Sequence, residues 1–184
     1  NSEAIKDGGE LSPLSVESQT VILKALKKSS REYQLMFYLA LFTGARLQTI
    51  CTLRIKCLFN RELDSHGFIR LPVGAGTGID TKFQKPMTLL IPHWLAQDLK
   101  IYINSEQARQ RRQKSDYGNS DENYVFLTKL GTPFYTSKVE QQELTERIKA
   151  SNSSRARLKL YEGEAVRSYL KGCLLYTSPS PRDS

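Results

Sequence analysis

An arginine beside a tight turn is the residue of this sequence best placed to do chemistry. Arg46 follows Thr43 and Gly44, which break an apolar segment, and it opens a short amphipathic stretch with Leu47 and Ile50 on one face. Glycine suits a backbone that turns tightly, often with positive φ, between two helices. A guanidinium on such a corner loses little entropy when it binds an anion, and its planar fork matches phosphate oxygens. The pattern indicates phosphate binding, although an arginine that caps a helix or pairs with a surface carboxylate would look the same.

Residues 41–54 resemble the first conserved box of the tyrosine recombinases, the phage integrase family. That box reads approximately apolar-apolar-Thr-Gly-x-Arg-x-x-Glu-apolar-x-x-Leu. The matching positions are Thr43, Gly44, Arg46, Ile50 and Leu53. Thr49 stands where the family usually has a glutamate, so a carboxylate that would support the site is missing. The resemblance implies that Arg46 binds the scissile phosphate and stabilises its transition state, with Thr43 beside it at the DNA.

A second segment, 79–92, resembles the lysine-bearing β-hairpin of the same family. There a Thr-Lys-x-x-Lys-like turn precedes a strand that ends in an apolar residue and proline. Lys82 falls on the position of the family's general acid, which protonates the 5′-oxygen leaving the phosphodiester, and Lys85 is the second candidate. An ammonium on a flexible stem can reach into a DNA groove, and general-acid assistance contributes about 10²–10⁴-fold. The alternative is that both lysines are solvated turn residues that only touch phosphates.

The later part of the family's site is incomplete in this sequence. Some members carry Glu-Gly-Glu-Thr-x-His-Ser-Phe-Arg-x-Gly-Cys, and 162–173 align with it through the flanking Glu-Gly-Glu and Gly-Cys. Arg167 then replaces the histidine and Leu170 replaces the second arginine, with Arg167 or Lys171 only partly restoring positive charge. The nucleophilic tyrosine of the family comes tens of residues later, so Tyr176 is too close to serve. We expect Tyr161 and Tyr169 to be packing residues.

Composition limits the remaining classes of function. The 184 residues suit one domain, and 27 Lys and Arg against 19 Asp and Glu give a net charge of +8 and a pI near 9.4, which favours a polyanionic partner. Three cysteines and two histidines show neither disulfide nor zinc spacing, so we expect no metal and an intracellular setting, cytoplasm or nucleus. No apolar run approaches the about 20 residues that span a bilayer.

Apolar periodicity predicts mainly helices around one small sheet. We expect helices from 15 to about 28, over 33–42 on a segment apolar on all sides, after residue 46, from 93 to about 113 and over 136–150. Alternating residues predict strands over 53–58, 68–73 and 87–91, the last two joined across a Gly-rich mobile loop, 74–78. The later turns of the 93–113 helix are basic, a feature of DNA contacts or of a solvated face. The order helices, small sheet, helices resembles the recombinase catalytic domain.

These observations predict an α+β domain, mainly α-helical with a small antiparallel sheet, of the tyrosine recombinase type. We expect a linker over 1–13, a partial catalytic domain over 14–173, and a non-native disordered tail over 174–184, where Ser-Pro-Ser-Pro resembles translated vector sequence. The parent enzyme would recombine or integrate DNA through a 3′-phosphotyrosyl intermediate, needing no metal or nucleotide. The partner would be double-stranded DNA, bound by a homo-oligomer in the family, with no membrane and no small-molecule substrate. This fragment would bind DNA without turnover.

Three other interpretations remain open from the sequence. A type IB topoisomerase shares this core and chemistry and would relax supercoils without synapsis. A catalytically inactive DNA-binding module descended from a recombinase fits Thr49, Leu170 and the absent nucleophile. A basic helical interaction domain with no nucleic-acid role would need Arg46 only for its fold.

Overall fold

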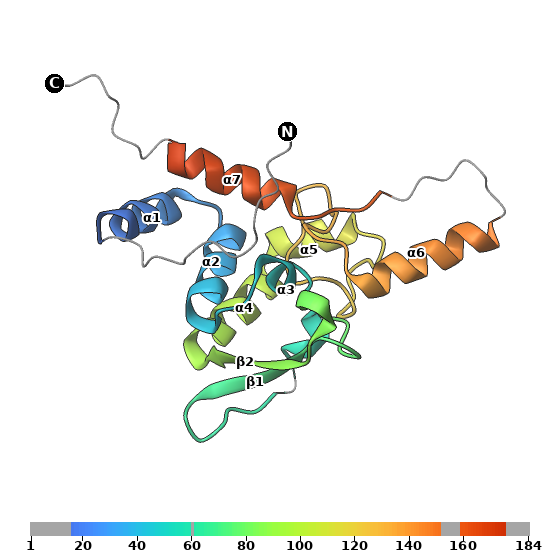
Figure 1. Cartoon of the computed structure of the whole chain (residues 1–184), viewed down its shortest axis with the longest axis horizontal. Coiled ribbons are helices and arrows are strands. Elements are labelled where there is room, and N and C mark those ends of the chain that lie inside the picture. Colours follow the sequence, from blue (N-terminus) through green and yellow to red (C-terminus); the bar gives the residue numbers. More distant parts are fainter. Residues whose placement is uncertain (1–15, 60, 152–158, 176–184) are drawn as a thin grey trace, which may run out of the picture.

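The computed structural model describes residues 16–59, 61–151 and 159–175, with the helices on one side of a two-stranded sheet (Figure 1). The helices are α1 (Val16–Lys28), α2 (Arg31–Thr43), α3 (Leu47–Cys51), α4 (His93–Asn104), α5 (Glu106–Gln113), α6 (Lys138–Ala150) and α7 (Glu164–Leu175). The strands are β1 (Phe68–Val73) and β2 (Met87–Pro92), and short 3₁₀ turns cover Ile55–Cys57 and Lys82–Gln84. The predicted α+β class, mainly helical with one small antiparallel sheet, is confirmed. The predicted linker over 1–13 and almost all of the predicted tail lie outside the described residues.

The sheet forms where alternation predicted it. Ile69 pairs with Ile91 and Leu71 with Leu89 in an antiparallel register, and all four side chains are buried on one face. Helices α2 and α4 pack over that face, so the core lies between the sheet and the helices (Figure 1). The sheet therefore gives the loop between its two strands, 74–86, a fixed base.

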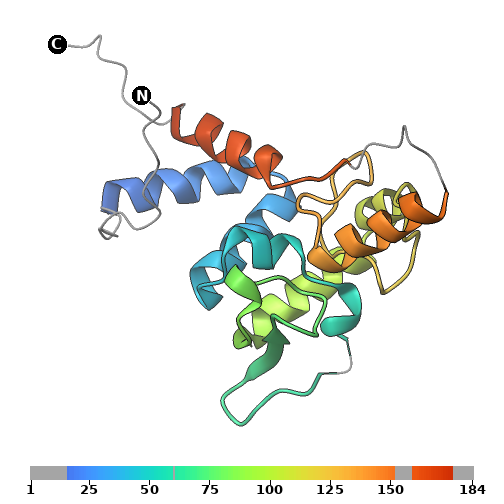
Figure 2. The ribbon, with the colours of Figure 1, turned by 45° about the vertical axis from the view of Figure 1, so that its right-hand side comes forward.

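Helices α1 and α7 lie on one side of the molecule, and α6 lies on the other (Figure 1). Helix α7 runs alongside α1, which two views show in agreement (Figures 1 and 2). Helix α6 lies on the opposite side of the molecule from α1 (Figure 1).

The central helix α2 buries Leu35, Met36 and Leu39, but Leu41 and Phe42 near its end are exposed. Although the segment 33–42 is apolar on all sides, protein therefore does not surround its last turn.

Two predicted elements differ from the structure. The segment 53–58 is not a strand: Arg54 makes a single bridge to Tyr124, and a 3₁₀ turn follows. The buried residues Ile55 and Leu58 are three apart, which suits a 3₁₀ turn better than a strand. The single helix predicted over 93–113 is two helices, because Ser105 adopts an extended conformation (φ −67°, ψ 151°) and its side chain accepts a hydrogen bond from the Ala108 N–H as the cap of α5.

The basic end of α5 is largely structural. Arg111 is buried and pairs with the buried Glu32 of α2 at 2.8 Å, and it also donates to the Leu127 carbonyl at 2.8 Å. Arg112 is buried too and donates to Asn119 at 2.9 Å. Neither arginine is on a solvated face. Of the basic side chains predicted there, Arg109 and Lys114 are exposed.

Candidate functional site

The turn between α2 and α3 has the conformation that its Thr-Gly sequence predicts. Gly44 adopts φ 68° and ψ 12°, and its N–H donates to the Ala40 carbonyl at 3.0 Å, so it ends α2 in the left-handed conformation that glycine tolerates best. The Thr43 hydroxyl donates to the Leu39 carbonyl at 2.6 Å and accepts from the Ala45 N–H at 3.2 Å. Its one proton is thus used inside the turn, so Thr43 has none to donate to a phosphate in this arrangement.

Arg46 immediately precedes α3 and extends into solvent. Its backbone is extended (φ −74°, ψ 156°), and its carbonyl accepts the first hydrogen bond of the helix, from the Ile50 N–H at 3.0 Å. The guanidinium is exposed and makes no hydrogen bond or ion pair with any residue in the described part of the chain. The structure therefore holds the backbone of Arg46 firmly and leaves its charged group available. That arrangement fits anion binding better than helix capping or a surface ion pair.

Asp80 connects the Arg46 helix to the segment that carries Lys82. Its buried carboxylate accepts hydrogen bonds from the Gln48 side chain at 3.1 Å, from the Gln84 side chain at 3.3 Å, and from the Lys138 backbone N–H at 3.1 Å. Lys138 is the first residue of α6, so this carboxylate also lies where the helix dipole favours a negative charge. Three segments of the chain thus meet at one side chain.

The Lys82 turn is short and internally bonded. The Thr81 hydroxyl donates to the Lys85 carbonyl at 2.7 Å, and the N–H groups of Gln84 and Lys85 donate to the carbonyls of Thr81 and Lys82 at 3.1 and 3.2 Å. Lys82 and Lys85 are both exposed. The turn that follows the predicted mobile loop, 74–78, is therefore closed by its own hydrogen bonds. Because Gln48 is two residues after Arg46 and Asp80 two residues before Lys82, their bond joins the two segments that carry the candidate cations.

The start of α7 packs against α3. Gly163 lies so close to Leu47 that an added Cβ would be 3.1 Å from its Cδ2 atom, and its N–H donates to the Phe134 carbonyl at 2.9 Å. Arg167 is exposed and donates to the Glu162 carbonyl. The segment proposed to replace the family's second box therefore lies next to the Arg46 helix.

Charged groups from the segment before Lys82 and from the region of α7 affect the pKa of Tyr135. Burial raises the pKa of its phenol, the negative charges of Glu162 and Asp80 raise it further, and Arg167 lowers it. Because such interactions weaken with distance, groups from the Lys82 segment and from α7 share one environment. Asp80, two residues before Lys82, and Arg167 of α7 are therefore both close enough to Tyr135 to affect its pKa.

Of the two tyrosines near the segment 162–173, Tyr169 packs against α2. Tyr169 stacks on Tyr33 of α2, with ring centroids 4.0 Å apart and an angle of 7° between the rings. Tyr161 is half-buried, and its backbone N–H donates to the Thr136 hydroxyl at 2.9 Å. Leu170 is exposed. Tyr176 lies outside the described residues.

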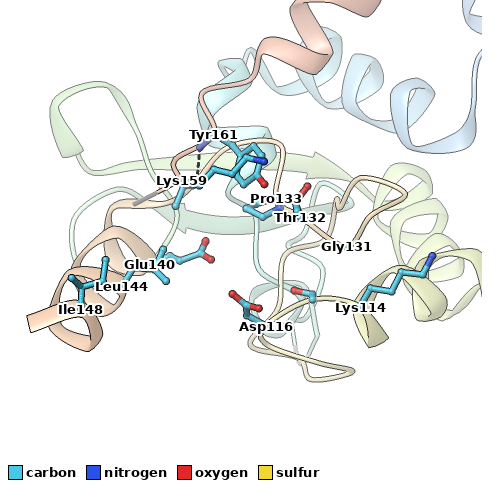
Figure 3. Close-up of a pocket in the computed structure, with 12 residues that line it drawn as sticks. Lys114, Asp116, Gly131, Thr132, Pro133, Glu140, Leu144, Ile148, Lys159 and Tyr161 are labelled. Atoms are coloured by element: carbon cyan, nitrogen blue, oxygen red, sulfur yellow. Dashed lines mark hydrogen bonds between the residues drawn. The ribbon is translucent and has the colours of Figure 1, made fainter. Parts of the chain in front are cut away.

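A cavity of about 250 Å³ lies elsewhere, between α6, the 131–136 loop and the chain around Tyr161 (Figure 3). Its lining residues are Lys114, Ser115, Asp116, Gly131, Thr132, Pro133, Thr136, Glu140, Leu144, Ile148, Lys159 and Tyr161. No residue of the Arg46 or Lys82 turns lines it. The cavity is therefore separate from the candidate site.

Sequence reasoning missed a buried polar cluster under α6. Arg54 lies over the Tyr124 ring, 3.9 Å from its centroid, and donates to the Ser137 hydroxyl at 2.7 Å. The Tyr124 hydroxyl contacts the Glu140 carboxylate, and burial raises the pKa of that carboxyl. Ser137 is also the N-cap of α6, so this cluster fixes the helix end that holds Asp80. The Ser-x-x-Glu spacing at 137–140 is a signal that could have located this cap.

The described residues contain no group of three or more His, Cys, Asp or Glu side chains arranged to hold a metal ion. None of the helices in the described ranges is long and apolar enough to cross a membrane.

Comparisons with known proteins gave structural similarities only. No protein-family model and no curated protein matches the sequence. Among solved structures, the chain is similar to the XerH site-specific recombinase bound to difH substrate in a pre-cleavage complex, with 16% identity and a TM-score of 0.45 over 90% of this chain. It is also similar to the Tn1549 transposon integrase in complex with circular intermediate DNA, with 16% identity and a TM-score of 0.42 over 97% of this chain. This chain spans 43% and 57% of those two structures.

Proposed function

We propose that this chain is part of the catalytic domain of a DNA breaking and rejoining enzyme of the tyrosine recombinase type. The observation that carries the proposal is the Gln48–Asp80 hydrogen bond, which joins the turn of Arg46 to the turn of Lys82. These are the two cations that the resemblance assigns to catalysis. A purely structural arginine would be expected to have a partner, and Arg46 has none within the described residues.

Each residue has a defined part in this proposal. Arg46 binds the scissile phosphate and stabilises the additional negative charge of its transition state, a contribution of about 3–4 kcal/mol for a preorganised donor. Lys82 protonates the leaving 5′-oxygen, and Lys85 contacts a neighbouring phosphate. The nucleophilic tyrosine is assigned neither to Tyr169, which stacks on Tyr33, nor to Tyr161, because the nucleophile of the family follows the second box by tens of residues. The complete enzyme would act intracellularly as an oligomer on DNA.

The chain itself should bind double-stranded DNA without marked sequence preference. The net charge of +8 supports binding by phosphate neutralisation, which weakens steeply as salt rises. Fluorescence anisotropy with a labelled duplex at several salt concentrations measures both the affinity and the salt slope. We expect Arg46→Ala to lower affinity about tenfold and to reduce the slope by about one unit.

The control for this experiment is Arg147→Ala. Arg147 is an exposed arginine in the last turn of α6, so its removal changes net charge equally without touching the candidate site. We expect Arg147→Ala to change affinity less than threefold, on the order of one nonspecific charge. Thermal unfolding of both variants should match the unaltered chain. An Arg46→Ala chain that unfolds, or one that binds DNA as well as Arg147→Ala does, would contradict the proposal.

A DNA-binding module without cleavage chemistry is the second candidate. It is favoured by Leu170, an exposed leucine at the position of the family's second arginine, and by Thr49, which is buried where a glutamate is usual. Sequencing the gene beyond the codon for Gly172 separates the two candidates. A His-x-x-Arg-like box followed some tens of residues later by a tyrosine supports the enzyme. A reading frame that stops at Ser184 supports the binding module.

A further inference from the structure

The most exposed large apolar side chain in the described structure is at the tip of the Lys82 turn. Phe83 is 88% exposed, although phenylalanine is usually buried. Its ring contacts no other aromatic ring among the described residues, and the Lys82 ammonium lies 5.4 Å from its centroid. Burial in the fold therefore does not explain this residue.

The backbone at this tip is strained. Phe83 (φ 57°, ψ 24°) and Gln84 (φ 56°) are consecutive, and in the described part of the chain they are the only residues other than glycine with positive φ. A left-handed conformation is unfavourable for any side chain with a Cβ, and more so for a bulky one. Strained exposed residues of this kind concentrate at sites that bind ligands.

The surrounding structure holds the strained turn in place. The Ala75 N–H donates to the Gln84 carbonyl at 3.1 Å, and the Gln84 side chain donates to Asp80 at 3.3 Å. Gly74 approaches so closely that an added Cβ would be 2.6 Å from the Lys85 carbonyl oxygen. The turn therefore presents the phenyl ring rigidly, so little entropy is lost when the ring binds a partner.

We propose that Phe83 stacks on an unpaired or unstacked base of the DNA bound at the Arg46–Lys82 site. This inference rests on the proposed function. A flat ring between two lysines matches a nucleotide, because the ring can contact the face of the base while Lys82 and Lys85 contact the adjoining phosphates. An apolar protein surface would match the ring but would supply no anion beside the exposed side chains of Lys82 and Lys85.

The test compares a fully paired duplex with the same duplex carrying one unpaired 2-aminopurine. The unaltered chain should bind the second DNA more tightly and should quench 2-aminopurine fluorescence by stacking. Phe83→Ala should lose about 5- to 150-fold in affinity for the unpaired site and less than twofold for the paired duplex. Phe83→Trp should keep the preference, and Phe83→Leu, which remains apolar but cannot stack, should lose most of it.

Leu130→Ala is the matched control, because Leu130 is also a highly exposed apolar side chain and lies outside the candidate site. It should leave both affinities unchanged. Phe83→Gly measures the strain separately, because glycine accepts positive φ. It should raise the thermal midpoint while losing the preference for the unpaired base.

The outcomes separate this inference from the proposed function. Salt-dependent binding of both DNAs with no effect of Phe83→Ala, or an equal loss on both, overturns the stacking role and leaves DNA binding intact. Absence of salt-dependent binding by the unaltered chain overturns the proposed function together with this inference. A fall in the thermal midpoint of Phe83→Gly would show that the side chain packs in the fold, which also overturns the stacking role.

Discussion

Replacing Asp80 by alanine should damage both the fold and DNA binding, although Asp80 does not touch DNA in our proposal. The carboxylate accepts hydrogen bonds from three donors, the Gln48 and Gln84 side chains and the Lys138 N–H, and it is buried. Hydrogen bonds to a charged group contribute about 1.5–3 kcal/mol each, but three bonds to one group are not additive. The N–H at the start of α6 would also lose its acceptor. We therefore expect Asp80→Ala to lower the free energy of unfolding by about 3–5 kcal/mol.

Urea denaturation followed by circular dichroism measures this loss, and two variants calibrate it. Asp80→Asn keeps the shape and one acceptor oxygen, so it should cost about 1–2 kcal/mol. Asp98→Ala removes a carboxylate that pairs at 2.9 Å with Arg31 on the surface, where both side chains are more than 30% exposed, and it should cost less than about 1 kcal/mol. An Asp80→Ala loss no larger than that of Asp98→Ala would refute the anchoring role.

The DNA measurement tests whether the anchor serves the site. Under conditions where Asp80→Asn is fully folded, its affinity for duplex DNA should fall about threefold or more, since Arg46 and Lys82 would no longer be held in one arrangement. A double-mutant cycle with Gln48→Ala should show coupling of about 0.5–3 kcal/mol between the two side chains. If the two losses simply add, Gln48 and Asp80 do not act together and the link between the two turns fails.

Three further predictions concern residues away from the anchor. Glu140→Gln should remove a pH dependence of the free energy of unfolding. Burial raises the pKa of Glu140 in the folded state, so its contribution to stability is complete below the ordinary carboxyl pKa of about 4.3 and is lost as pH rises through the raised pKa. Urea denaturation between pH 4 and 7 would detect this loss. Gly74→Ala should cost about 2 kcal/mol or more and weaken DNA binding, because its Cβ would meet the Lys85 carbonyl at a φ of 105°; equal thermal midpoints would contradict this. Arg111→Met should cost about 3–5 kcal/mol by leaving Glu32 buried without its partner, and adding Glu32→Met should recover much of that loss in the same denaturation assay.

Local patterns predicted those parts of the fold that local interactions decide. The two strands follow from alternating burial, and the turn at Gly44 follows from the glycine after an apolar helix. The break at Ser105 was missed although Ser105 is a recognisable helix cap, because the apolar and basic residues on both sides continue a helical period. The burial of Arg111 was missed for another reason. Its partner Glu32 is 79 residues away, and charge alone favours an exposed position.

The candidate site shows the same division between local and distant information. Arg46 and Lys82 could be nominated because each occupies a short motif, but neither motif predicts that the two turns meet. That meeting depends on Gln48 and Asp80, which are 32 residues apart, and a polar pair at that separation leaves no periodic pattern. A carboxylate within the buried segment around Ile79 is nevertheless informative, because a buried charge must find donors. Searching for those donors near a suspected cation is a way to recover such an anchor, and here it would connect the two catalytic candidates through Asp80, a residue to which neither motif assigns a role.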